Sequence, residues 1–289
     1  MVEGFWAKDL LELTLREYML RREITFVTGR CFTGMTTGIS ILDAMINGIS
    51  PGSMVVVGGQ PGVGKTAIAL QIATATAESD AAVIYCFGEN KLENLHIRMI
   101  CQHSNLSAVA YTRGLGDINV LKEAGRKHCL AVKNNICFLK IDKEFSVKDI
   151  KDTIGRYRSD REPDKKFLVV VDYLQKLAEN RRGVELRAAV AGVSAELQRF
   201  AGDEKGVGIL LISSLSRAAY YGDKASYGFK ESGDIDYDAD VAINLVKSAN
   251  PKKPNVVELV VIKNRFGSCG NIELVFDEKS GKFLEPKKK

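Results

Sequence analysis

The stretch GGQPGVGKTAIAL, residues 58–70, decides the fold. It is a glycine-rich turn that ends in Lys65 and Thr66 and continues into alanines and leucines. Residues 59–66 fit the pattern G-x-x-x-x-G-K-[ST], which wraps phosphate groups when it joins a strand to a helix. Both neighbours are expected here, because a β-branched run precedes the turn and a helical pattern follows it. An incidental glycine-rich turn is the alternative.

Each residue type in this turn has a physical task. Glycines allow the backbone to wrap an anion with its N–H groups pointing inward, and a helix that begins near Gly64 adds the positive end of its dipole. Lys65 reaches the β- and γ-phosphates, and the Thr66 hydroxyl completes the coordination of Mg²⁺. The turn therefore predicts a site for ATP and Mg²⁺. The expected nucleotide-binding residues are Gly59, Gln60, Pro61, Gly62, Val63, Gly64, Lys65, Thr66 and Ala67.

Two strand ends supply the carboxylates that phosphoryl transfer to water needs, one for the metal and one for the water. KFLVVVDYLQ, residues 166–175, is an apolar strand that ends in Asp172, and a carboxylate there, beside a phosphate turn, is expected to hold the metal. VIYCFGEN, residues 83–90, ends another strand in Glu89, which we expect to polarise the attacking water. The alternatives are a strand-end cap for Asp172 and a helix-capping acid for Glu89.

Short apolar strands alternate with helical patterns through most of the chain. Buried-type strands are expected at residues 54–57, 81–87, 135–141, 166–172 and 207–214. Helical patterns lie at residues 92–101, 147–157 and 184–200. This alternation predicts an α/β fold with a mostly parallel central sheet flanked by helices. Runs joined by short turns predict antiparallel edge strands near the C-terminus, at residues 240–246, 256–267 and 271–277.

Composition and charge exclude several classes of protein. The chain has 289 residues, of which 45% are hydrophobic and 27% charged, and no apolar run approaches the ~20 residues that cross a bilayer. Acids and bases interrupt the apolar pattern of the first residues, so they do not form a secretory signal. We expect a cytoplasmic protein with no membrane partner. The net charge of +5 permits a polyanionic partner without demanding one.

The cysteines have no C-x-x-C spacing, and we expect no disulfides. Cys101 and His103 could in principle join His128 and Cys129 in a four-ligand zinc set, although neither pair has the usual ligand spacing. Buried thiols and helix-end histidines are the alternative that we favour.

The stretches described so far resemble, in their order along the chain, the ATPase domain of the DnaB family of ring-shaped replicative helicases, a branch of the RecA-like fold. The similarity runs from about residue 33 to residue 276. Its parts are TGISILDAMINGISPGSMVVVGGQPGVGKTAIALQIA, FGENKLENLHIRMI, VVVDYLQ, SSLSR, ESGDIDYDADVAINL and VIKNRFGSCGNIELVFD. The DYLQ tetrapeptide, the Asp-Ala-Asp run and the Lys-Asn-Arg turn are more specific than the phosphate turn alone.

The resemblance implies catalytic roles. Glu89 would be the general base, Asp172 the metal carboxylate, and Lys65 the phosphate-binding cation. Lys263 and Arg265 match positions at which the family inserts cations into the neighbouring subunit's site, where they stabilise charge on the γ-phosphate. Without the resemblance, these two residues would be solvated charges on a hairpin.

The resemblance also implies partners. Two loops, residues 179–187 and 216–233, match loops that face the ring's central channel in the family. Both carry cations, and the second also carries interleaved aromatics. The candidates for DNA contact are Arg181, Arg182, Arg217, Lys224 and Lys230. Without the resemblance they would be solvated loop residues. The implied partners are single-stranded DNA, further copies in a ring that we expect to be hexameric, and primase or a helicase loader.

Two features depart from the family pattern. Ser214 stands where the family usually has a glutamine thought to sense the γ-phosphate, and its side chain reaches less far. Before the ATPase domain, full-length members carry a separate N-terminal domain, whereas here only an amphipathic segment precedes it, as in a fragment or a minimal member. This segment resembles the linker helix that docks on the next subunit, although its periodicity also allows packing on its own domain. We divide the chain into this linker segment, residues 1–32, and a RecA-like ATPase domain, residues 33–289.

The sequence thus predicts a DNA-stimulated ATPase and helicase, a ring motor that hydrolyses ATP at subunit interfaces to translocate on single-stranded DNA during replication. Two alternatives stay open. One is a recombination ATPase of the RadA or RecA type, which forms filaments on DNA. The other is a nucleotide-gated assembly protein with little hydrolysis, which the serine at position 214 keeps open.

Overall fold

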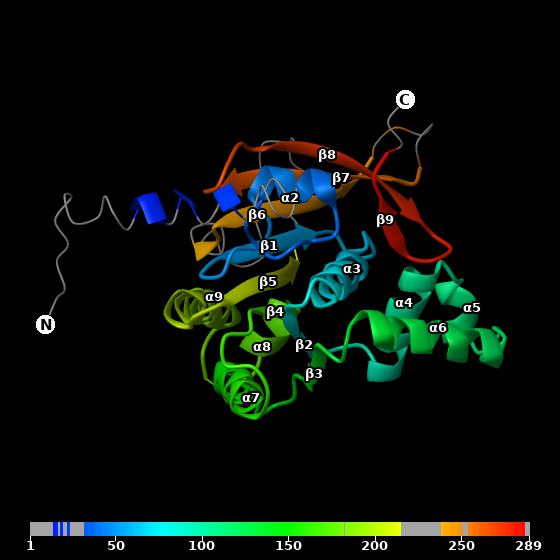
Figure 1. Cartoon of the computed structure of the whole chain (residues 1–289), viewed down its shortest axis with the longest axis horizontal. Helices are drawn as coiled ribbons and strands as arrows, with labels where there is room; N and C mark the ends of the chain where they lie inside the picture. Colours follow the sequence, from blue (N-terminus) through cyan, green and yellow to red (C-terminus); the bar gives the residue numbers. More distant parts are fainter. Residues whose placement is uncertain are drawn as a thin grey trace, which may run out of the picture.

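The computed structural model describes residues 14–16, 18–19, 22–23, 32–181, 183–214, 238–248, 250 and 254–286. Within these residues a mixed sheet of nine strands carries helices on both faces (Figure 1). The strand order is β3-β2-β4-β5-β1-β6-β7-β8-β9. None of the helices in this part of the chain combines the length and the apolar character needed to cross a bilayer. The predicted α/β fold is confirmed.

The first six strands pair in parallel: β1 (Met54–Gly59), β2 (Ala82–Phe87), β3 (Ile136–Lys140), β4 (Phe167–Asp172), β5 (Val207–Ser214) and β6 (Val241–Lys247). The last three form the antiparallel edge: β7 (Val256–Asn264), β8 (Gly270–Asp277) and β9 (Lys282–Leu284). Grouping β6 with the antiparallel strands was wrong in one respect, because β6 is parallel to β1 and only its pairing with β7 is antiparallel.

The helices lie before β1 or in the connections between strands. They are α2 (Ser40–Ile46), α3 (Lys65–Glu78), α4 (Leu92–Ser104), α5 (Ala108–Thr112), α6 (Ile118–Ala131), α7 (Val147–Asp160), α8 (Leu174–Ala178) and α9 (Leu186–Asp203). The predicted helical patterns correspond to α4, α7 and α9. The sequence patterns did not predict α5, α6, α8 or β9.

The core consists of two layers, one on each face of the sheet. Successive side chains of a strand point to opposite faces, so Val55 and Val57 pack with α2, α3 and α4, whereas Met54 and Val56 pack with α7, α8 and α9. Strands covered on both faces are apolar at every position, and β1, β2 and β4 are buried along their whole lengths. This double cover explains why the central strands are continuous apolar runs in the sequence.

Helix α4 packs on α3, and α5 and α6 pack on α4 (Figure 1). All three histidines of the chain meet between α4 and α6. The ring of His128 lies 5.8 Å from that of His96 and 5.5 Å from that of His103, measured between centroids. His128 is 2% exposed, and its Nδ1 has no hydrogen-bond partner among the described residues. Burial, assisted by the charges of His96 and His103, lowers the pKa of His128 to about 4. The buried imidazole is therefore neutral at physiological pH.

The zinc alternative finds no support here. Cys101 is buried in α4, whereas Cys129 is exposed on α6. Across the described ranges, no group of three or more His, Cys, Asp or Glu side chains is arranged to hold a metal ion.

We expect the fold to lose stability as the pH falls from 6.5 to 4. His128 in the unfolded chain titrates near 6.5, but in the folded chain near 4, so in this window only the unfolded state takes up the proton and is favoured. The free energy of unfolding should fall by up to about 3 kcal/mol between pH 7 and pH 4 because of this group. Urea unfolding of the protein and of a His128→Leu variant across this range measures the effect. Equal pH slopes in the two proteins would contradict it.

Candidate active site

The phosphate turn joins the end of β1 to the start of α3. Gly62 and Gly64 have φ angles of 76° and 106°, a region that residues with a Cβ rarely adopt. A Cβ on Gly64 would in addition lie 2.8 Å from the ring of Phe283. The shape of the turn therefore requires glycine at position 64 for two independent reasons.

The N-terminus of α3 opens onto this turn without a side-chain cap. Its first backbone N–H groups and the positive end of its dipole can therefore serve an anion. Lys65 Nζ donates to the carbonyl oxygens of Gly59 at 2.8 Å and Gln60 at 3.0 Å. Burial lowers the pKa of Lys65, and the nearby Asp172 carboxylate opposes this shift. The ammonium group is thus held against the turn.

Asp172 ends β4 beside the turn and is 5% exposed. Its Oδ2 accepts a hydrogen bond of 2.9 Å from the Tyr85 hydroxyl. Burial raises the pKa of Asp172, while the hydroxyls of Tyr85 and Thr66 favour its charged form. Carboxylate and hydroxyl oxygens are ligands that Mg²⁺ prefers, so Thr66 and Asp172 together could hold a divalent cation.

Glu89 follows β2 and is exposed. The hydroxyl of Tyr173, the residue next to Asp172, donates to Glu89 Oε1 at 2.6 Å. Burial, together with this bond, raises the pKa of Tyr173, so the phenol stays protonated and able to donate. The bond fixes the direction in which the Glu89 carboxylate points.

These side chains line one cavity of about 520 Å³. The residues predicted from the sequence that line it are Pro61, Gly62, Gly64, Lys65, Thr66, Ala67, Glu89 and Asp172. Gly59, Gln60 and Val63 belong to the turn but not to the cavity lining, whereas Ser214 at the end of β5 does line it. The cavity combines a cation, an uncapped helix N-terminus and two carboxylates, which are the groups that bind and cleave a phosphate anhydride.

Sequence patterns missed several contributors. Arg98 of α4, Tyr173 and Phe276 line the cavity, and Tyr85 lies behind Asp172. A tyrosine inside a buried strand needs a partner for its hydroxyl. The position of Tyr85 in an apolar strand therefore indicated a buried polar partner, which the structure shows to be Asp172. Arg98 gave no such indication, because a single arginine on an amphipathic helix is usually a solvated residue.

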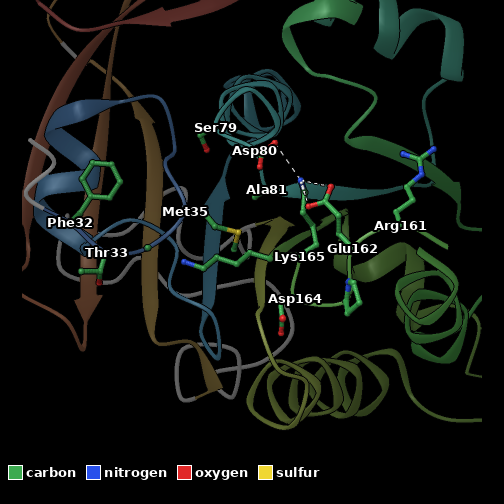
Figure 2. A pocket seen from close by; sticks show the side chains of 13 residues that line it. Phe32, Thr33, Met35, Ser79, Asp80, Ala81, Arg161, Glu162, Asp164 and Lys165 are labelled. Carbon is green, nitrogen blue, oxygen red and sulfur yellow. Dashed lines mark hydrogen bonds and ion pairs between the residues drawn. The ribbon is translucent and has the colours of Figure 1, made fainter. Parts of the chain in front are cut away.

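A second cavity, of about 630 Å³, lies at the opposite ends of the parallel strands, where β2 and β4 begin (Figure 2). Lys165 Nζ lies 3.3 Å from Asp80 Oδ1 and 3.0 Å from Glu162 Oε1, the contacts drawn in Figure 2. Because the Lys165 ammonium is already matched by two carboxylates, this cavity offers less to a phosphate than the cavity at the phosphate turn.

The structure does not bring Lys263 and Arg265 to the cavity. Because β7 runs antiparallel to β6, its last residues lie at the start of β6, whereas the phosphate turn lies near the end of β6. Arg265 Nη1 instead donates to Asp240 Oδ1 at 2.7 Å. Both predicted cations therefore lie where the parallel strand β6 starts, whereas the phosphate turn of the same chain lies near the end of that strand.

One of the predicted DNA contacts, Arg181, lies within the described ranges, where it forms an ion pair with Glu196 of α9. The other candidates lie outside the described residues: Arg182, Arg217, Lys224 and Lys230. Their contact with DNA stays a prediction.

The fold and the phosphate turn together define an α/β protein of the RecA-like P-loop class. The family described as "DnaB-like helicase C terminal domain" matches residues 34–285, and the chain belongs to this family.

Similar proteins agree with this assignment. The chain is 29% identical over 263 residues to the replicative DNA helicase DnaB of Geobacillus stearothermophilus, and 28% identical over 277 residues to a probable plasmid replicative DNA helicase of Chlamydia psittaci. These alignments cover 87% and 92% of this chain but 56% and 58% of the relatives, so the chain spans little more than half their length.

Two solved structures have the same fold. One is described as an ATPase domain, with a TM-score of 0.84 at 23% identity over 99% of this chain and 100% of that one. The other is a DnaB-like replicative helicase described with its interactions with primase, with a TM-score of 0.81 at 22% identity over 99% of this chain and 68% of that one.

Proposed function

We propose that this chain is the motor domain of a ring-shaped replicative helicase, which hydrolyses ATP with Mg²⁺ to move along single-stranded DNA and separate the duplex. The observation that carries the proposal is the cavity in which the phosphate turn, Asp172 and Glu89 meet. The relatives' names, which are those of replicative helicases, favour this function over that of a recombination ATPase.

Binding of the triphosphate rests on the turn and the start of α3. The uncapped N-terminus of α3 binds phosphate oxygens with its backbone N–H groups. Lys65 exchanges its carbonyl partners for the β- and γ-phosphates. Thr66 and Asp172 line the same cavity, which supports a metal site between them, and Mg²⁺ bound there would offset phosphate charge.

Glu89 takes the role of general base. Its exposed carboxylate lines the cavity, and the Tyr173 hydroxyl holds one of its oxygens. The other oxygen is then able to accept the proton of a water aimed at the γ-phosphate. Asp172 is unsuited to this task, because it is buried and its Oδ2 is already hydrogen-bonded to Tyr85.

Hydrolysis is completed by Arg265, with Lys263, from an adjoining copy. The phosphate turn and these cations lie at opposite ends of the strands of one sheet. A chain is therefore unable to bring its own Arg265 to its own cavity. Head-to-tail contact between copies brings the phosphate turn of one copy to Arg265 of the next, and such contacts form a ring when the rotation from copy to copy closes. A guanidinium supplied in trans is worth about 10³ to 10⁵ in rate. We propose a hexameric ring.

The other parts of the chain have roles in the same assembly. In the segment of residues 1–32, Leu15, Tyr18 and Met19 are 52%, 59% and 58% exposed, which leaves apolar surface to dock on the next copy. Arg181 and the cations of the loops predicted to contact DNA would follow phosphates of the strand. We also propose that the protein is cytoplasmic and that it binds primase or a helicase loader.

A Glu89→Gln variant should bind ATP normally but hydrolyse it at least about 100-fold more slowly, because the amide does not accept the proton of water. Steady-state phosphate release and titration with a fluorescent ATP analogue measure the two quantities. Glu93→Gln, which changes an acid in the first turn of α4, is the matched control and should keep full turnover. Undiminished turnover in Glu89→Gln would contradict the base assignment. A parent protein without turnover would instead favour the nucleotide-gated assembly protein.

An Arg265→Ala variant should retain ATP binding and lose about 10³-fold in turnover. Mixing it with a Lys65→Ala variant should restore part of the activity, because some interfaces then combine an intact phosphate turn with an intact arginine. Turnover is measured against the mixing ratio, with mixed assembly verified by mass. Absence of rescue in verified mixed assemblies would argue against action in trans.

Single-stranded DNA should stimulate ATP turnover, and the stimulation should fade as salt rises, because phosphate contacts release counterions. A salt series of ATPase rates with and without DNA provides the measurement, and a duplex-unwinding assay separates helicase from strand-pairing activity. Turnover indifferent to DNA at every salt concentration would be incompatible with a DNA motor.

A further inference from the structure

Asp240, which lies outside the cavity, accepts two hydrogen bonds from Arg265. Asp240 directly precedes β6 and is 6% exposed. Its Oδ1 accepts from Arg265 Nη1 at 2.7 Å, and its backbone carbonyl accepts from the Arg265 N–H at 3.0 Å. The same residue therefore fixes both the side chain and the backbone of this arginine.

Asp240 is in turn anchored to the sheet. Its Oδ2 accepts from the backbone N–H of Met54 at 2.9 Å, and its own N–H donates to the Met54 carbonyl at 2.9 Å. Met54 begins β1 and is 0% exposed. Asp240 thus joins Arg265 to the strand that ends, at Gly59, in the phosphate turn.

The turn that carries Arg265 is held by a second residue, Asn264. Its Nδ2 donates to the carbonyls of Met45 and Ser268, each at 2.9 Å, and its Oδ1 accepts from the Phe266 N–H at 3.0 Å. Just before this turn, the pairing of β7 with β6 shifts register. Such bulges redirect the side chains that follow them, so backbone geometry and hydrogen bonds both determine where Arg265 points.

The guanidinium group of Arg265 still reaches solvent. The Arg265 side chain is 51% exposed, whereas that of Asp240 is 9% exposed. A guanidinium has five N–H donors, and the bond to Oδ1 of Asp240 uses one nitrogen of the fork. The remaining donors suit a second anion, in the bidentate geometry that arginine forms with phosphate.

We propose that Asp240 is a positioning residue for hydrolysis in trans, which holds the Arg265 guanidinium by one nitrogen so that its other donors meet the triphosphate of an adjoining copy. This inference rests on the proposed function, because it takes Arg265 as the cation supplied to the neighbouring site. A long side chain ordered before contact with the phosphate loses less entropy at the moment of reaction. Asp240 provides that order from a buried anchor.

The test is an Asp240→Asn variant of the full chain. Asparagine keeps the size of the side chain, but it carries no charge and has a single acceptor oxygen where the Met54 N–H and the Arg265 guanidinium each need one. We expect kcat for ATP to fall by about 10- to 100-fold, with KM for ATP and the mass of the assembly unchanged. Asp149→Asn, which alters the capping box of α7, is the matched control and should keep full turnover.

A double variant separates positioning from a merely structural role. If Asp240 acts through Arg265, then Asp240→Asn combined with Arg265→Ala turns over no more slowly than Arg265→Ala alone. A further, additive loss overturns the inference. If Asp240→Asn does not fold, Arg265→Lys gives the same test, because lysine keeps the charge but lacks the fork. A loss of about 10- to 100-fold in its kcat then supports the inference, and full turnover overturns it.

The outcomes also separate this inference from the proposed function. Full turnover by Arg265→Ala overturns the role in trans and this inference with it. Loss of turnover in Arg265→Ala beside full turnover in Asp240→Asn overturns this inference alone.

Discussion

The parallel pairing of β1, β2, β4 and β5 is the constraint on which the candidate site depends. It brings the ends of these strands to one edge, where Gly59 pairs with Ser214 and Phe87 pairs with Asp172. Because side chains alternate along a strand, a slip of one residue would turn Asp172 to the other face of the sheet, away from Tyr85. The apolar side chains packed on both faces fix the register, and through it the position of the Asp172 carboxylate.

The change to antiparallel pairing at β7 places Arg265 far from the phosphate turn of the same chain. The chain returns along β7 to the end of the sheet where the parallel strands begin. Arg265 pairs there with Asp240, which is bonded to Met54 at the start of β1, whereas the phosphate turn follows the end of β1. That strand is buried at each of its positions. The two surfaces by which one copy would contact its neighbours are therefore a fixed distance apart, as a closed ring of identical contacts requires.

The sequence allowed prediction of those parts of the site that depend on a few neighbouring residues. Glycine spacing revealed the phosphate turn, and strand ends revealed Asp172 and Glu89. The partners that orient these carboxylates were missed, since Tyr85 lies 87 residues from Asp172 and Tyr173 lies 84 residues from Glu89. Pairing over such separations is set by the order of strands in the sheet, which no local pattern specifies.

The missed helices have another physical cause. On α6, Ile118 and Leu130 are 58% and 79% exposed, and Leu115 just before it is 77% exposed. Apolar residues on the solvent side blur the stripe by which an amphipathic helix is recognised. Uncovered apolar side chains thus explain why α6 was missed, whereas α5 and α8 are each only five residues long and too short to show a helical period.

The pairing of Arg265 with Asp240 poses a question of charge, because a carboxylate partly cancels the cation that would stabilise the γ-phosphate. For a side chain that is half exposed, water screens the pair and the cancellation is weak. The carboxylate itself is buried and needs donors, which Met54 and Arg265 supply. Once a neighbour's triphosphate excludes that water, a guanidinium spans both anions with separate nitrogens, as an ammonium does not. In the proposed assembly the geometry of the two contacts would then matter more than the net charge, which would favour an arginine over a lysine beside Asp240.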